Sequence, residues 1–136
     1  MEPNDRRLDM GERASNAITG IRTIAVPVTD QDRAVIFYVG TLGLEKRLDA
    51  PIEQLGGRWI EVAPPGSATS IALVPASPDA AAGVETGVRL STADVASLHK
   101  ELAAIGTDVD ELLLWEGVPP MFALRDPDGN ALVIVE

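Results

Sequence analysis

Apolar and polar residues alternate from Ile21 to Val28, which is the period-two pattern of a half-buried β-strand. Thr29 and Asp30 then offer side chains that can cap a helix N-terminus, and Gly43 suits the left-handed residue that often follows a helix. Between them the apolar residues follow helical spacing; they are Ala34, Phe37, Tyr38 and Leu42. Short β segments are predicted next, at Leu44–Leu48, Arg58–Val62 and Ile71–Val74.

The second half of the chain repeats this order. Gly87–Leu90 predicts a strand, and a residue between Ser91 and Asp94 can cap the helix that follows. The apolar stripe of that helix consists of Val95, Leu98, Leu102 and Ile105, and Gly106 ends it. Strands are predicted near Asp110–Trp115, at Met121–Leu124 and after the Asp126–Gly129 turn. The number of residues from Gly43 to Gly106 equals the number from Gly66 to Gly129. This constant offset between the two halves indicates an internal duplication.

Size and charge narrow the range of functions. With 136 residues, 46% of them hydrophobic, we expect one globular domain (21–136) after a flexible tail at 1–20, with modules at about 21–78 and 83–136. The net charge of −10 disfavours nucleic acid and anionic membranes as partners. Since the chain has no Cys, no apolar run of transmembrane length and no visible signal peptide, we expect a cytoplasmic protein without disulfides.

Three motifs carry a family resemblance. They are Asp126-Pro127-Asp128-Gly129-Asn130 before the last strand, Val28-Thr29-Asp30…Phe37-Tyr38…Leu42-Gly43-Leu44 in the first half, and the segment from Arg58 to Gly66. In this order the chain from about Ile21 to Glu136 resembles small bacterial members of the vicinal oxygen chelate superfamily, also called the glyoxalase, bleomycin-resistance and dioxygenase superfamily. The resemblance implies an α+β fold, in which two βαβββ modules form a curled, half-open mixed β-barrel with helices outside and a cavity inside. It also implies a homodimer.

Alternation along the strands predicts which side chains face that cavity. One side of each strand must meet the helices and be apolar; Ile24, Val26, Val28, Ile60, Val62, Ile71, Leu73, Val88 and Leu90 fit that side. The other side then holds the candidate ligand-binding residues Thr23, Trp59, Glu61, Arg89 and Met121.

The resemblance also bears on metal binding. Metal-dependent members of the superfamily take one ligand from each of four strands, and these positions fall here on Thr23, Ala72, Gly87 and Val133. None of them is His, a carboxylate or a thiolate, so we expect no metal and no cofactor. His99, the only His, is expected on the surface of the second helix.

Several candidate residues keep two interpretations. Trp59 can stack on a planar ligand or be an ordinary core residue. Trp115 lies in an apolar segment with Gly and Pro, and it can line the cavity mouth, join a dimer contact or simply pack. Glu61 and Arg89 can orient a ligand, or they can pair with each other or stay hydrated. Tyr38 is expected in the core.

Three functions remain open on these grounds. The favoured one is a metal-independent protein that sequesters a small aromatic or antibiotic-like molecule. The alternative is a lyase or isomerase with an atypical site, in which Glu61 is the base, provided that burial raises its pKa, and Arg89 stabilises an oxyanion. The third is a subunit or sensor domain whose cavity is filled by its own side chains.

Overall fold

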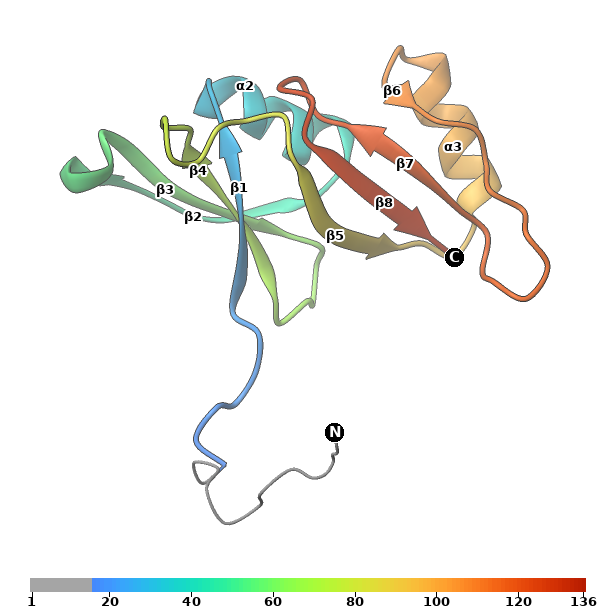
Figure 1. Ribbon diagram of the computed structural model, residues 1–136, viewed down its shortest axis with the longest axis horizontal. Coiled ribbons are helices and arrows are strands. Elements are labelled where there is room, and N and C mark those ends of the chain that lie inside the picture. Colours follow the sequence, from blue (N-terminus) through green and yellow to red (C-terminus); the bar gives the residue numbers. More distant parts are fainter. Residues whose placement is uncertain (1–15) are drawn as a thin grey trace.

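The computed structural model describes residues 16–136, so most of the expected tail at 1–20 lies outside the described residues. Figure 1 shows two groups of strands along the long axis of the molecule, each accompanied by a helix. The first group comprises β1 (Thr23–Val28), α2 (Gln31–Val35), the π-helix η2 (Ile36–Thr41), β2 (Glu45–Ile52), the 3₁₀ turn η3 (Glu53–Leu55), β3 (Gly57–Ala63) and β4 (Ser70–Pro75). The second comprises β5 (Glu85–Ser91), α3 (Val95–Ala104), β6 (Asp108–Val109), β7 (Met121–Arg125) and β8 (Ala131–Val135).

Both groups have the same topology. The first sheet has the strand order β1-β4-β3-β2 and the second has β5-β8-β7-β6. β1 runs parallel to β4, and β5 runs parallel to β8. The other neighbouring strands are antiparallel. The expected pair of βαβββ modules and the α+β class are therefore confirmed. Within residues 16–136 no strand pairing joins the two sheets, so β1 and β5 are both edge strands.

The helices begin where their sequence predicts. Asp30 accepts a hydrogen bond from the Arg33 amide at 3.0 Å, and Asp94 accepts one from the Ser97 amide at the same distance. Each side chain thereby satisfies an amide that the first helical turn leaves unpaired. Gly106 has φ of +88°, a conformation in which any other residue would be strained. The expected stripe is wrong at its end: Ile105 is 66% exposed, because the helix has already ended at Ala104.

Two predicted strands differ from the structure. β2 runs from Glu45 to Ile52 instead of ending at Leu48. The strand expected near Asp110–Trp115 is wrong, because β6 covers only Asp108 and Val109. Beyond it, Leu113 alone pairs with Met121 as an isolated bridge. The apolar run after Asp110 is therefore mostly a loop.

The core lies between the sheets and the helices, as strand alternation predicted. All the helix-facing residues named above either belong to one buried cluster or pack against it. Tyr38 is fully buried in that cluster, which confirms its expected place, and Phe37 packs edge-on against it. The opposite, helix-free side of each sheet is called the open face below. No helix among the described residues is long and apolar enough to cross a membrane, and the expected cytoplasmic location stays a prediction.

Gln31 at the start of α2 ties the helix to the first sheet. Its Nε2 donates to the carbonyls of Arg58 at 2.6 Å and Leu73 at 2.8 Å, and its Oε1 accepts from the Arg58 amide at 3.0 Å. The amide group thus bridges β3 and β4 beside Ile60 and Leu73, the pair at one end of their shared ladder. Gly57 makes room for it, because a Cβ there would lie 2.8 Å from Gln31 Oε1 and 2.9 Å from Pro75 Cγ.

Candidate functional site

A polar cluster around Glu61 marks the open face of the first sheet. Glu61 is only 8% exposed and accepts hydrogen bonds from Trp59 Nε1 and Ser70 Oγ, each at 2.8 Å. Arg22 Nη2 lies 3.9 Å from the same carboxylate. These two hydrogen bonds, the Trp59 bond first, lower the pKa of Glu61 below its ordinary value of 4.5, although burial acts to raise it. Glu61 is therefore ionised at neutral pH, and its bond holds the Trp59 indole in a fixed orientation.

A mainly apolar cavity of about 360 Å³ marks the open face of the second sheet, and we call it the face cavity. It is lined by Asp110, Glu111, Leu113, Met121, Phe122, Ala123 and Val133. The volume falls at the lower end of the range for small-molecule sites. The pairing of the strands shows which positions of the two open faces correspond. Glu61 of β3 pairs with Ala72 of β4, and at the equivalent place in the second sheet Ala123 of β7 pairs with Val133 of β8. The second sheet thus has a methyl group where the first has a carboxylate.

Glu61 and Arg89, which the lyase or isomerase hypothesis places in one active site, lie on different sheets. Glu61 bonds to Trp59 and Ser70 on the first sheet, whereas Arg89 is exposed on β5 of the second. Arg89 Nη1 contacts Met121 Sδ at 3.9 Å, and within residues 16–136 it forms no ion pair with a carboxylate. Burial does not raise the pKa of Glu61 on balance, so the condition for its role as a base is not met.

Thr23 borders the Glu61 cluster, and Trp115 belongs to the loop before β7. Thr23 is half-buried at the start of β1, opposite Ser70 on β4. Trp115 is 67% exposed and Leu114 is 70% exposed in the loop before β7. Neither Thr23 nor Trp115 lines the face cavity. The loop therefore presents an apolar surface to solvent.

The residues at the four metal positions do not fit a divalent ion. Thr23, Ala72 and Val133 offer neither imidazole nor carboxylate. Gly87 sits at a bulge of β5 with φ of +76°, where a His would be strained. No group of three His, Asp or Glu side chains suited to a metal occurs among the residues that the structure describes. We therefore derive no chemistry through a metal.

His99 is more than a surface residue of α3. Its ring is half-buried and packs edge-on against Phe122, with the ring centres 4.9 Å apart. Its Nε2 lies 2.8 Å from the Asp110 carbonyl, which can only accept, so Nε2 donates. The expected position on the helix is right, but the side chain anchors α3 to the segment that lines the face cavity.

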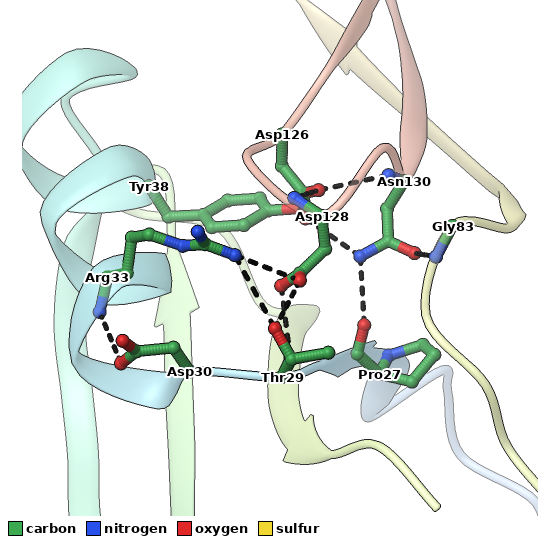
Figure 2. A network of polar contacts seen from close by, with 9 residues as sticks. All are labelled: Pro27, Thr29, Asp30, Arg33, Tyr38, Gly83, Asp126, Asp128 and Asn130. Atoms are coloured by element: carbon green, nitrogen blue, oxygen red, sulfur yellow. Dashed lines mark hydrogen bonds and ion pairs between the residues drawn. The ribbon is translucent and has the colours of Figure 1, made fainter. Parts of the chain in front are cut away.

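The Asp126–Asn130 turn joins the two modules through a polar network that we call the module clasp (Figure 2). Asn130 is fully buried and uses its whole amide group. Its Oδ1 accepts from the amides of Gly83 at 2.8 Å and Val84 at 3.0 Å. Its Nδ2 donates to the Pro27 carbonyl at 2.8 Å and to Asp126 Oδ2 at 2.9 Å. One side chain thus connects the end of β1, the link between the modules and the final turn.

The aspartates of this turn extend the clasp to the first helix. Tyr38 donates its hydroxyl proton to Asp126 Oδ2 at 2.8 Å. Burial, followed by the charge of Asp126, raises the pKa of Tyr38 far above its ordinary value, so the hydroxyl stays protonated. Asp128 accepts from the Thr29 amide at 3.1 Å and from Arg33 Nη2 at 3.1 Å. The sequence marks these residues only as a turn, because their partners lie in the first module.

Comparison with known proteins identifies the family. Residues 20–134 match the model of the Glyoxalase/Bleomycin resistance protein/Dioxygenase superfamily. The chain belongs to this superfamily. The resemblance found in the motifs is therefore confirmed. The sequence matches no curated protein.

Solved structures include similar chains from two bacteria. The antibiotic binding protein TnmS3 from Streptomyces sp. CB03234 is 35% identical, with a TM-score of 0.78 over 88% of this chain and 96% of that one. A superfamily member from Sphaerobacter thermophilus DSM 20745 is 32% identical, with a TM-score of 0.80 over 88% of this chain and 98% of that one. A glyoxalase/bleomycin resistance protein from the same Streptomyces strain is 34% identical, with a TM-score of 0.74 over 86% of this chain and 100% of that one.

Proposed function

We propose that this member of the superfamily is a metal-independent binding protein that sequesters a small, planar and largely apolar molecule. The observation that carries the proposal is the face cavity, whose lining includes Val133 in place of a metal ligand. Met121, Ala123 and Leu113 give that cavity apolar surface suited to an organic ligand. Similarity to a protein that binds an antibiotic supports an antibiotic-like ligand.

Trp59 supports a planar ligand in particular. Its only polar atom, Nε1, already donates to Glu61, so the indole needs no further polar partner and keeps one orientation. A half-buried ring held in this way is a preorganised surface for stacking. Little conformational entropy is then lost when a planar molecule binds.

The proposal includes a homodimer whose two copies enclose the ligand. Trp59 and the face cavity lie on different sheets, and no helix or strand between residues 16 and 136 covers either open face. Leu114, Trp115 and Val118 expose apolar surface close in sequence to the cavity lining, and a second copy would bury it. A curled arrangement of the sheets around the ligand is part of this proposal.

An enzymatic role for Glu61 and Arg89 gains less support. A general base works best when its pKa lies near the operating pH, and the pKa of Glu61 is lowered instead. Both of its carboxylate oxygens already accept hydrogen bonds from the protein. If the protein is nevertheless a lyase or isomerase of this type, Glu61→Gln should abolish turnover without changing ligand affinity.

A fluorescence screen with matched variants tests the binding function. Planar, apolar natural products are screened by quenching of tryptophan emission. Ala123→Phe fills the face cavity and should weaken binding at least tenfold, on the order of 1.4 kcal/mol. Ala96→Phe, on the exposed side of α3, adds the same ring elsewhere and should leave affinity unchanged.

Trp59→Ala should weaken binding by roughly 1–3 kcal/mol, the scale of losing one buried aromatic contact. A ligand that binds equally well to wild type, Ala123→Phe and Trp59→Ala would place the site elsewhere and contradict the proposal.

A further inference from the structure

Arg89 lies on the open face of the second sheet, at the margin of the face cavity. Its neighbours Val88 and Leu90 pack in the core, so alternation along β5 turns Arg89 to the other side. Strand register agrees, because Arg89 pairs with Val133 of β8, and Val133 pairs with Ala123 of β7. Paired residues on adjacent strands share a face, and Val133 and Ala123 both line the cavity. Figure 1 shows these three strands side by side, with β5 at the edge of the sheet, so Arg89 borders the cavity from that edge.

A contact with the cavity lining places the guanidinium over the cavity. Arg89 Nη1 lies 3.9 Å from Met121 Sδ, and Met121 of β7 is a lining residue. Because β8 lies between β5 and β7, the Arg89 side chain reaches across β8 to make this contact. A thioether is only a weak acceptor, so the contact leaves most of the hydrogen-bonding capacity of the guanidinium unused.

Arg89 differs from the other arginines of the described chain in its charge partners. Each of the others has a carboxylate within 4.0 Å; they are Arg22, Arg33, Arg47, Arg58 and Arg125. Between residues 16 and 136 Arg89 has none, although the protein carries 21 acidic residues. Its guanidinium therefore keeps its capacity to bind an anion.

The opposite margin of the face cavity is acidic. β5 and β6 form the two edges of the sheet, and Asp110 and Glu111, which directly follow β6, line the cavity. Asp110 accepts hydrogen bonds from Arg125 at 2.9 and 3.0 Å, whereas Glu111 forms no ion pair with any residue from 16 to 136. A ligand with one negative group is attracted to Arg89 and repelled from Glu111, which favours a single orientation in the cavity.

The surface between the two margins suits an aromatic ring system. Val133, Ala123 and Leu113 contribute only hydrocarbon, and Met121 adds a polarizable thioether that contacts aromatic rings favourably. The volume of about 360 Å³ is enough for a small organic molecule. From the β5 edge to the β6 edge, a ligand thus meets a cation, then apolar surface, then carboxylates.

We propose that the ligand of the face cavity is a planar aromatic monocarboxylate, with its carboxylate on Arg89 and its rings over Val133 and Ala123. This inference rests on the proposed function and names the chemical class of the ligand. The planar guanidinium fork can make two parallel hydrogen bonds to a carboxylate. The net charge of −10 opposes any anion, but the repulsion from distant surface carboxylates is screened at physiological ionic strength.

Equilibrium dialysis with 2-naphthoate and its uncharged analogue 2-naphthamide tests the proposal. Wild-type protein should bind the acid at least about fivefold more tightly, the upper end of what an exposed ion pair provides. Arg89→Gln should reduce this preference to less than about twofold, because it removes the charge and leaves the apolar lining unchanged. Lys100→Gln, which neutralises an exposed lysine on α3, is the matched control and should behave as wild type. Ala123→Phe should weaken the binding of both compounds, because both occupy the face cavity.

The variants separate failure of this inference from failure of the proposed function. Equal affinities for the acid and the amide, or a preference for the acid that survives in Arg89→Gln, would overturn the inference. If Ala123→Phe still weakened both compounds, the binding function of the face cavity would stand. Acid binding that Ala123→Phe leaves unchanged would place the acid outside the face cavity and contradict both.

Two further results would overturn the inference alone. Tighter binding of the cationic analogue 2-naphthylmethylamine than of 2-naphthoate would assign the charge selectivity to Glu111. Absence of 2-naphthoate binding at about 1 mM would exclude an aromatic acid as the ligand. The planar-ligand screen then decides separately whether the face cavity binds a neutral molecule.

Discussion

Asn130→Ala is expected to destabilise the protein by about 3–5 kcal/mol. The side chain is fully buried and makes four hydrogen bonds, three to backbone groups and one to the Asp126 carboxylate. A neutral hydrogen bond contributes about 1 kcal/mol and one to a charged group about 1.5–3 kcal/mol. The total free energy lost with these four hydrogen bonds is smaller if a water molecule enters the space left by the amide group. A domain of this size is stable enough for the variant to remain folded at 25 °C.

Urea unfolding followed by circular dichroism at one fixed protein concentration measures the effect. With a slope of about 1.5 kcal/mol per molar urea, the midpoint should fall by about 2–3 M. Asn16→Ala is the matched control, because Asn16 is exposed and its loss should cost less than about 0.5 kcal/mol. If Asn130→Ala costs no more than Asn16→Ala, the clasp does not hold the modules together.

An isosteric variant separates hydrogen bonding from packing. Asn130→Asp keeps the shape and can still accept from Gly83 and Val84, but it cannot donate to Pro27 or Asp126 when ionised. It also places a negative charge against the Asp126 carboxylate, which lies 2.9 Å from the present amide nitrogen. It should therefore be at least as unstable as Asn130→Ala at pH 7, and it should recover at acidic pH, when one carboxyl is protonated. An Asp variant as stable as wild type at pH 7 would contradict this account.

The other predictions concern a glycine, a carboxylate, metals and assembly. Gly57→Ala should lower the thermal midpoint by several degrees, because its Cβ would lie 2.8 Å from Gln31 Oε1, whereas Gly40→Ala, with open space around it, should not. The lowered pKa of Glu61 means that its stabilising effect is present above about pH 4.5 and lost as pH falls through the lower folded-state value. The stability gap between wild type and Glu61→Gln should therefore narrow as the pH falls below about 4.5, and a gap that widens on acidification would refute this sign. Elemental analysis should find less than about one-tenth equivalent of Zn, Ni, Mn or Fe, since the four metal positions lack ligands; thermal stabilisation by one of these ions would argue the opposite. Light scattering at micromolar concentration should give the mass of a dimer rather than that of a single 14.4 kDa chain.

Local signals made most of the fold predictable. The predicted cap positions, Thr29 or Asp30 and Ser91 to Asp94, include the observed caps Asp30 and Asp94, and the bond that each cap accepts comes from only three residues away. The open-face position of Trp59 and Glu61 followed from alternation along one strand, and the bond between them agrees with it. The prediction failed at the loop near Trp115, where an apolar run resembles a strand although Gly and Pro follow it closely.

The features that could not be predicted from the sequence depend on contacts between distant parts of the chain. Nothing near Asp126 in sequence indicates that it accepts a proton from Tyr38, which lies 88 residues earlier. The separate placement of Glu61 and Arg89 follows from how the two sheets are arranged, which alternation within a strand does not determine. The bulge at Gly87 likewise becomes visible only from the pairing of β5 with β8.

The module clasp also affects the order in which a newly made chain can fold. Pro27 and Thr29 lie near the start of the first module, and their partners Asn130 and Asp128 are 103 and 99 residues later. Those partners leave the ribosome long after the first module, so the first module emerges before the groups that complete its polar contacts. During translation the Tyr38 hydroxyl and the Pro27 carbonyl must be hydrated by water instead. The native arrangement of the first module is therefore reached only after the Asp126–Asn130 turn of the second module has been synthesised.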